Sequence, residues 1–235
     1  MRLFAIGDLH LSGGDNKPMD VFGPQWDRHF FHIRENWERL VREEDTVLIP
    51  GDISWAMQLR DAREDLEEIG QLPGKKILCK GNHDYWWNSI SQVRSVLPAS
   101  MKAVQHSAVD LGETVICGTR GWLIPTEEMP LSTQDEKICR REAERLHLAL
   151  EEATAIAAGR PVIVMTHYPP LLAGTTETLF TELLEAYRVK TAVYGHLHGT
   201  GIQNGFSGEH RGIRYHLVSC DSIGFCPKQI EIHKY

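Results

Sequence analysis

The stretch Gly81-Asn82-His83-Asp84 decides how this chain is interpreted, since it places an amide, an imidazole and a carboxylate in consecutive positions. It follows the apolar run 77–79, which predicts a buried strand ending at the polar stretch. Four further clusters also come just after short apolar runs: Asp8-Leu9-His10, Gly51-Asp52, His167, and Gly195-His196-Leu197-His198. Because ligands gather beyond the carboxyl ends of strands in open α/β sheets, the clusters predict one shared site.

Length, composition and charge limit the class of protein. The chain has 235 residues, 42% hydrophobic and 24% charged, which fits a globular fold with an ample core, and we expect a single domain over residues 1–235. No apolar run approaches the roughly 20 residues that cross a bilayer, and five cysteines without a CxxC pair fit a reducing compartment. We therefore expect a cytoplasmic protein that does not bind membranes. A net charge of −7 argues against a stable nucleic-acid complex, which needs a basic face.

The hydrophobic pattern predicts a layered α/β fold. Apolar runs indicate strands at 3–6, 47–49, 76–79, 162–165 and 191–194, and helical spacing indicates helices from about 26 to 40 and at 58–69, 89–97, 133–158 and 177–187. Thr133 and Glu136 have the spacing of a capping box for the longest helix. Residues 101–118, with an antiparallel pair, and 202–232 are mostly strand. Two mixed sheets packed together, with helices outside, accommodate this order of elements.

The residue types in the clusters indicate a metal site. Aspartate, asparagine and histidine suit ions such as Mn, Fe or Zn. In each of the pairs Asp8/His10 and His196/His198, both side chains can point the same way, because alternate residues of an extended chain share a face. The donors outnumber the four ligands of one tetrahedral zinc and fit two ions that share a carboxylate. Such pairs of ions stabilise both oxygens of a phosphoryl displacement.

The order D-x-H, G-D, G-N-H-D, H, G-H-x-H over residues 7–198 resembles the signature of the calcineurin-like metallophosphoesterase family. The resemblance implies a β-sandwich flanked by helices, in four layers, and two divalent metal ions. One ion would be held by Asp8, His10, Asp52 and His198. The other would be held by Asp52, Asn82, His167 and His196, with Asp52 as the bridge. It also implies in-line attack on phosphorus by a metal-bound hydroxide, without a covalent enzyme intermediate.

The same resemblance assigns catalytic roles to His83 and Asp84. His83 would stabilise the transition state or protonate the leaving oxygen. Asp84 resembles the acidic residue that orients this histidine, since carboxylate–imidazole pairing fixes the tautomer.

The chain departs from the protein phosphatases of the superfamily, which carry arginines shortly after the G-D and G-N-H-E motifs. Residues 51–55 and 81–86 contain no arginine. Because arginine clamps suit the dianion of a phosphomonoester, we expect a phosphodiester substrate. Arg120, in the 119–131 loop, is a candidate for a substrate contact, with a plain surface role as the alternative. Trp55, Trp86 and Tyr168 either stack on a planar group of the substrate or pack beneath the site.

The sequence thus predicts a dinuclear hydrolase for a small phosphorylated substrate, with a nucleotide-like compound as one option. A phosphomonoesterase or nucleotide pyrophosphatase on the same site remains open, as does a non-catalytic metal-binding interaction module. A diiron oxygen-handling protein is disfavoured, since no Glu-x-x-His helices are evident. The loops at 12–25 and 119–131 are expected to shape specificity.

Overall fold

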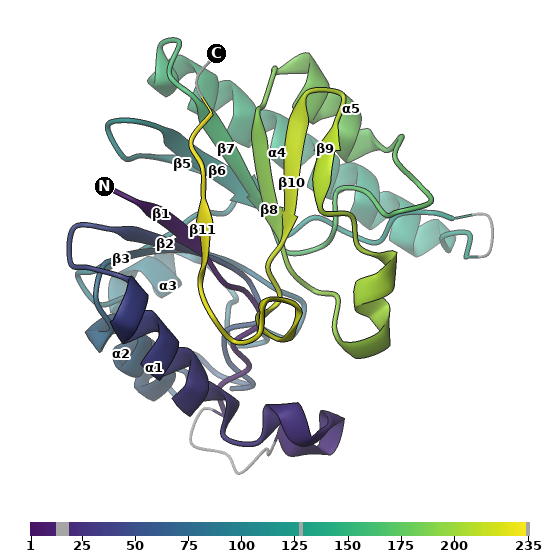
Figure 1. Ribbon diagram of the computed structural model, residues 1–235. Coiled ribbons are helices and arrows are strands. Elements are labelled where there is room, and N and C mark those ends of the chain that lie inside the picture. Colours follow the sequence, from purple (N-terminus) through teal and green to yellow (C-terminus); the bar gives the residue numbers. More distant parts are fainter. Residues whose placement is uncertain (13–18, 127–128, 234–235) are drawn as a thin grey trace.

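Short apolar runs form two mixed sheets in the computed structural model, which describes residues 1–12, 19–126 and 129–233 (Figure 1). The first sheet has the order β11-β1-β2-β3-β4, with β1 at Leu3–Ala5, β2 at Thr46–Pro50, β3 at Lys75–Cys79, β4 at Met101–Ala103 and β11 at Lys228–Ile230. The second has the order β5-β6-β7-β8-β10-β9, with β5 at Ser107–Asp110, β6 at Val115–Thr119, β7 at Val162–Thr166, β8 at Thr191–Tyr194, β9 at Gly208–His210 and β10 at Ile213–Leu217.

Parallel pairing gathers the carboxyl ends of the central strands at one edge. In the first sheet β1, β2, β3 and β4 are parallel neighbours, and in the second β6, β7, β8 and β10 are. The outer strands β11, β5 and β9 are antiparallel to their neighbours, and the β5–β6 pair confirms the antiparallel strands predicted within residues 101–118.

Helices cover the outer faces of both sheets. They are α1 at His29–Leu40, α2 at Arg63–Gln71, α3 at Ile90–Val96, α4 at Thr133–Ala157 and α5 at Leu179–Ala186. Figure 1 shows α1 and α2 outside the first sheet, and α4 and α5 along the second. None of the helices in the described part of the chain is long and apolar enough to cross a membrane.

Apolar side chains fill the space between all the layers. Ile33 and Trp37 of α1 pack with the outer face of the first sheet, and Leu146 and Leu150 of α4 pack with the outer face of the second. A third cluster lies between the sheets and combines residues of both, among them Leu3, Leu48, Ile77, Ile116, Ile163 and Val193. The predicted fold, two mixed sheets packed as a sandwich and flanked by helices, is confirmed.

The helix starts differ from those predicted. The cap of α4 is Ser132, whose hydroxyl oxygen accepts the backbone N–H of Asp135 at 3.1 Å, so the capping box predicted at Thr133 is wrong by one residue. The helix expected from Trp26 begins at His29, because the left-handed backbone of Arg28 separates it from a short 3-10 turn at 24–26. Similarly, turns occupy residues 57–62, and α2 begins after them.

The two sheets are joined at their carboxyl edge by backbone hydrogen bonds. The N–H of Gly7, just after β1, donates to the carbonyl oxygen of Val218 at 2.7 Å, and the N–H of Cys220 donates to the carbonyl oxygen of Gly7 at 3.1 Å. The segment that follows β1 is therefore fixed against the segment that follows β10. Asp8, the residue after Gly7, is therefore held at the place where the two sheets are joined.

Candidate metal centre

All seven predicted metal-binding side chains lie together at the junction of the sheets. In the first sheet Asp8 and His10 follow β1, Asp52 follows β2, and Asn82 follows β3; in the second, His167 follows β7, and His196 and His198 follow β8. The common position at strand ends brings together residues as much as 190 positions apart, such as Asp8 and His198.

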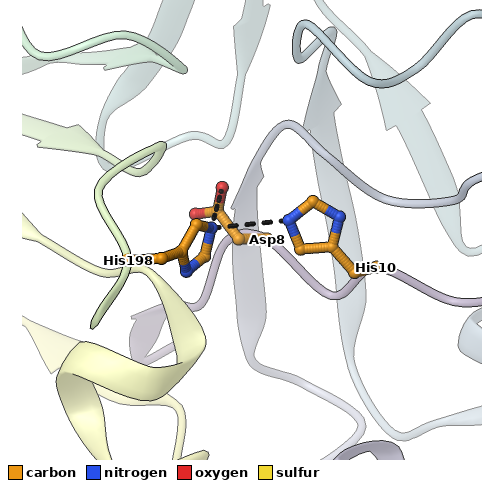
Figure 2. A group of neighbouring side chains, drawn as sticks. All are labelled: Asp8, His10 and His198. Atoms are coloured by element: carbon orange, nitrogen blue, oxygen red, sulfur yellow. Dashed lines mark hydrogen bonds and ion pairs between the residues drawn. The ribbon is translucent and has the colours of Figure 1, made fainter. Parts of the chain in front are cut away.

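One group of donors is formed by Asp8, His10 and His198 (Figure 2). The Nε2 atom of His198 lies 3.2 Å from Oδ1 of Asp8 and 3.4 Å from Nε2 of His10. Figure 2 shows Asp8 and His10 on one segment and His198 reaching them from the other sheet. The potential ligand atoms of these residues lie within 4.8 Å of one another, close enough to bind one ion.

A second group surrounds Asn82. Its Oδ1 atom lies 2.7 Å from Nε2 of His167 and 2.9 Å from Nδ1 of His196. The carboxylate oxygen Oδ2 of Asp52 lies 3.5 Å from Nε2 of His167 and 3.8 Å from Nε2 of His10. One oxygen of Asp52 therefore faces both groups, as a bridging ligand would.

The backbone at the site takes conformations that are rare elsewhere. Asp8, His10, Asp52 and His196 all have positive φ angles, of 60°, 46°, 51° and 73°. Each such non-glycine residue costs on the order of 1–3 kcal/mol, and this strain concentrates at functional sites.

Glycines make room for the two carboxylates. A Cβ atom at Gly81 would lie 2.1 Å from Oδ1 of Asp52, and one at Gly195 would lie 2.2 Å from Oδ2 of Asp8. The glycine that opens each of the motifs G-N-H-D and G-H-x-H is therefore needed for close approach of an aspartate.

Burial gives the donor set the chemistry of a metal site. Burial lowers the pKa of His10 and of His167. Burial and the nearby His167 lower the pKa of His196 to about 3. These three imidazoles therefore keep free lone pairs. The pKa of Asp52 is raised, mainly by burial and further by the neighbouring carboxylates of Asp84 and Asp8. Lone pairs and carboxylates crowded in one buried place repel each other, and cations offset that repulsion. The residues present therefore fit divalent metal ions.

Asp221 is a functional residue that the sequence interpretation missed. Its Oδ1 atom lies 2.9 Å from Nδ1 of His198, and its Oδ2 atom accepts the backbone N–H of Gly199 at 2.9 Å. Burial would lower the pKa of His198, but Asp8 and Asp221 raise it to about 10. A carboxylate on the far nitrogen of a ligating histidine fixes the ring and its tautomer. The available signal was its position shortly after a strand, as for the other carboxylates.

Asp84 holds two loops together instead of orienting His83. Its fully buried carboxylate accepts the backbone N–H groups of Gly81 at 2.7 Å and Asp52 at 3.0 Å. It also accepts those of Ile53 and Ser54 and the indole N–H of Trp86. Among the described residues it makes no hydrogen bond to the His83 ring, so the predicted carboxylate–imidazole pair is not formed. The physical reason is that five N–H donors already occupy this carboxylate.

His83 stands over the centre without binding any of the other donors through its ring. Its backbone N–H donates to Oδ1 of Asp52 at 2.8 Å, and the Nδ1 atom of its half-buried ring has no hydrogen-bond partner within the described residues. Burial lowers the pKa of the imidazole. The ring lines a cavity of about 310 Å³ together with His10, Phe22, Trp26, Asp52, Trp55, His196 and His198. Its place in the cavity fits a group that contacts a bound substrate.

Comparison with known proteins agrees with this geometry. Residues 1–200 match the family described as calcineurin-like phosphoesterase. The chain belongs to this family. Membership of the family and the grouped aspartates and histidines support a metal-dependent phosphoester hydrolase.

Individual relatives are distant from this phosphoesterase. It is 36% identical over 87 residues to the Gene 66 protein of Mycobacterium phage D29. The matching region covers 35% of this chain and 40% of that protein. The structure of phosphopantetheinyl hydrolase from Mycobacterium tuberculosis is similar to this one with a TM-score of 0.60 and 17% sequence identity. A protein of unknown function from Aquifex aeolicus is similar with a TM-score of 0.55 and 16% identity. Each comparison covers 97% of this chain and 95% of the other chain. A Thermus thermophilus protein has 0.54 at 13% identity, over 99% of both chains. These likenesses show the fold alone.

The predicted substrate contacts of this phosphoesterase divide into one that lines the cavity and three that do not. Trp55 lines it and stacks on His10, with ring centroids 4.8 Å apart. Trp86 is fully buried and donates its indole N–H to Asp84, which is the packing alternative given for it and not the stacking one. Tyr168 is 6% exposed and packs on His196 at 4.2 Å, which leaves it a supporting role. Arg120 does not line this cavity but a neighbouring one.

Replacing Asp84 with asparagine should destabilise the whole protein. The amide of Asp84→Asn would point an NH₂ group at buried N–H donors, so we expect the free energy of unfolding to fall by about 2–4 kcal/mol. Urea unfolding with and without EDTA measures this, and the exposed substitution Asp61→Asn is the control. Unchanged stability with lost turnover would instead assign Asp84 to the orientation of His83.

Replacing Asp221 with asparagine should weaken metal binding with little effect on the fold. Loss of the carboxylate behind a ligating histidine lowers metal affinity about 10–100-fold. Competition of the protein with a chromogenic chelator for Mn²⁺ measures the affinity, with Glu209→Gln as a surface control. Equal affinity of Asp221→Asn and the unmodified protein would contradict the assignment.

Proposed function

We propose that this chain is a phosphodiesterase that uses two divalent ions, of Mn, Fe or Zn, to hydrolyse small phosphorylated substrates. The observation that carries the proposal is the position of Asp52, whose Oδ2 atom lies within 3.8 Å of histidines in both donor groups. A shared carboxylate between two sets of ligands is the arrangement that two-metal hydrolases need.

The roles of the residues follow from their positions. We assign one ion to Asp8, His10, Asp52 and His198, and the other to Asp52, Asn82, His167 and His196. Bound ions would supply Lewis acidity for the attacking and phosphoryl oxygens. His83, in the wall of the cavity, donates a hydrogen bond to a phosphoryl oxygen or a proton to the leaving oxygen. Asp84 keeps the loops of Asp52 and Asn82 in register, and Asp221 orients His198.

The walls of the cavity favour a diester over a monoester. Among the described residues that line it there is no arginine or lysine to neutralise a second negative charge on the scissile phosphate. Phe22, Trp26 and Trp55 instead offer apolar and aromatic surface for an ester group. A diester, with one charge and two organic groups, fits this surface better than a phosphomonoester dianion does.

Metal removal tests the proposed function directly. With bis(p-nitrophenyl) phosphate as substrate, EDTA followed by desalting should abolish hydrolysis, because the ions would supply the Lewis acidity that the reaction needs. Mn²⁺ added back should restore it, and the diester should be hydrolysed faster than p-nitrophenyl phosphate. Full activity after the ions are shown to have left, by elemental analysis, would contradict metal catalysis. A preference for p-nitrophenyl phosphate would favour the phosphomonoesterase.

Replacing His83 with alanine should separate turnover from metal binding. His83→Ala removes a group that acts on the substrate and no ligand, so kcat should fall about 10²–10⁴-fold while metal content stays unchanged. Elemental analysis and steady-state kinetics measure the two properties. His32→Ala, on the exposed side of α1, serves as the neutral control. Loss of metal in His83→Ala would show that this histidine is a ligand.

A further inference from the structure

A second cavity lies at the same edge of the sheets. It encloses about 230 Å³, and its walls include Lys80 after β3, Gln105 after β4, Arg120 after β6, and Arg141, Glu142 and Arg145 of α4. The metal-binding residues follow β1, β2, β3, β7 and β8. This cavity lies at the ends of the next strands outward in each sheet, β4 and β6. The two cavities share the segment after β3.

The charges around this second cavity do not balance. Four cationic side chains face one carboxylate, that of Glu142, in a chain whose net charge is −7. Glu142 is buried, lies 2.6 Å from Arg145 and 3.8 Å from Arg120, and accepts the hydroxyl of Thr119. Arg141 has no ion pair within the described residues. Several positive charges held close together repel each other, and a bound anion offsets that repulsion.

Other contacts fix two of the cationic groups, Lys80 and Arg120, before any ligand binds. The Nζ atom of Lys80 donates to the carbonyl oxygen of Trp87 at 2.5 Å. The guanidinium of Arg120 lies over the ring of Trp122 at 4.4 Å, and its side chain is only 20% exposed. Because these side chains are already ordered, an anion would bind them at a smaller entropic cost.

The walls of this cavity adjoin the segments that carry the metal-binding residues. Lys80 directly precedes the segment Gly81-Asn82, and the carbonyl oxygen of Arg120 accepts the backbone N–H of His167 at 3.1 Å. Neighbouring strands lie about 4.8 Å apart, so one or two strand spacings separate the two sites by roughly 5–10 Å. A nucleoside that carries phosphates on both sides of its sugar spans a distance of this size.

We propose that this second cavity binds a second phosphate group of the substrate, while the scissile phosphodiester occupies the metal centre. The inference rests on the proposed function and narrows it to phosphoesters that carry another phosphate. Arg141 and Arg145 are then specificity residues that do not touch the reacting atoms.

Two chromogenic substrates that differ by one phosphate test this. The first is the p-nitrophenyl ester of thymidine 5′-phosphate, and the second is the same compound with a 3′-phosphate. With the Mn²⁺-loaded protein, kcat/KM should be about tenfold higher for the second, since charge-assisted hydrogen bonds are strong. Arg141→Gln, and Arg141→Gln combined with Arg145→Gln, should remove this advantage and leave the first substrate within twofold. Arg140→Gln, its neighbour facing a different cavity, should change neither.

The outcomes separate this inference from the proposed function. No advantage of the 3′-phosphate in the unmodified protein, or an advantage that survives both variants, would overturn the inference. Equal losses for both substrates in Arg141→Gln, whose side chain is exposed, would overturn it too, since they would assign Arg141 to the reaction of either substrate and not to a second phosphate. If neither substrate reacts, the proposed function fails, and calorimetric binding of thymidine 3′,5′-bisphosphate against thymidine 5′-phosphate still decides the inference. Inhibition by inorganic phosphate that depends on Arg141, without a 3′-phosphate advantage, would instead assign the cavity to free phosphate and overturn it.

Discussion

The burial of two aspartates beside each other is the constraint on which the rest of this structure depends. Asp8 and Asp52 are 0% and 2% exposed at the junction of the sheets, where desolvation alone would favour their neutral forms. Keeping charged groups in such a place requires nearby positive charge. Burial lowers the pKa of His10, His167 and His196, so these three supply ligand atoms more readily than charge, while Asp8 and Asp221 raise the pKa of His198. Divalent metal ions, which the grouped aspartates and histidines suggest, would supply the positive charge that this place requires.

The seven donor positions could be predicted from the sequence because they obey a simple geometric rule. Each follows an apolar run, and parallel strands bring their carboxyl ends to one edge whatever the length of chain between them. The fold class followed from the same alternation of strands and helices. The roles of Asp84, Trp86 and Asp221 could not be predicted in this way. They depend on which loop meets which across the edge, and local spacing carries no information about that contact.

Asp84 shows the difference between position and role. The family resemblance predicted an imidazole partner for it, but its carboxylate points into the protein, toward the amides of Gly81 and of the segment after β2. Trp86 follows it inward and donates its indole N–H to the same carboxylate. A consecutive pair in sequence thus separates into His83, which faces the cavity, and Asp84, which supports it.

Two cavities with different walls lie at this edge of the sheets. The cavity over the donor groups has aromatic walls and no cationic side chain among its described lining residues, while the neighbouring cavity concentrates cations from α4 and from the ends of β3 and β6. The long helix α4 packs against β5 and β6, and its Arg141 and Arg145 line the second of these cavities.

Anomalous X-ray scattering from crystals of the Mn²⁺-loaded protein would show whether two ions lie around one carboxylate. The account predicts two anomalous peaks about 3.5–4 Å apart, with Asp52 between them and Asn82 beside one. A single peak, or two peaks without Asp52 between them, would contradict it.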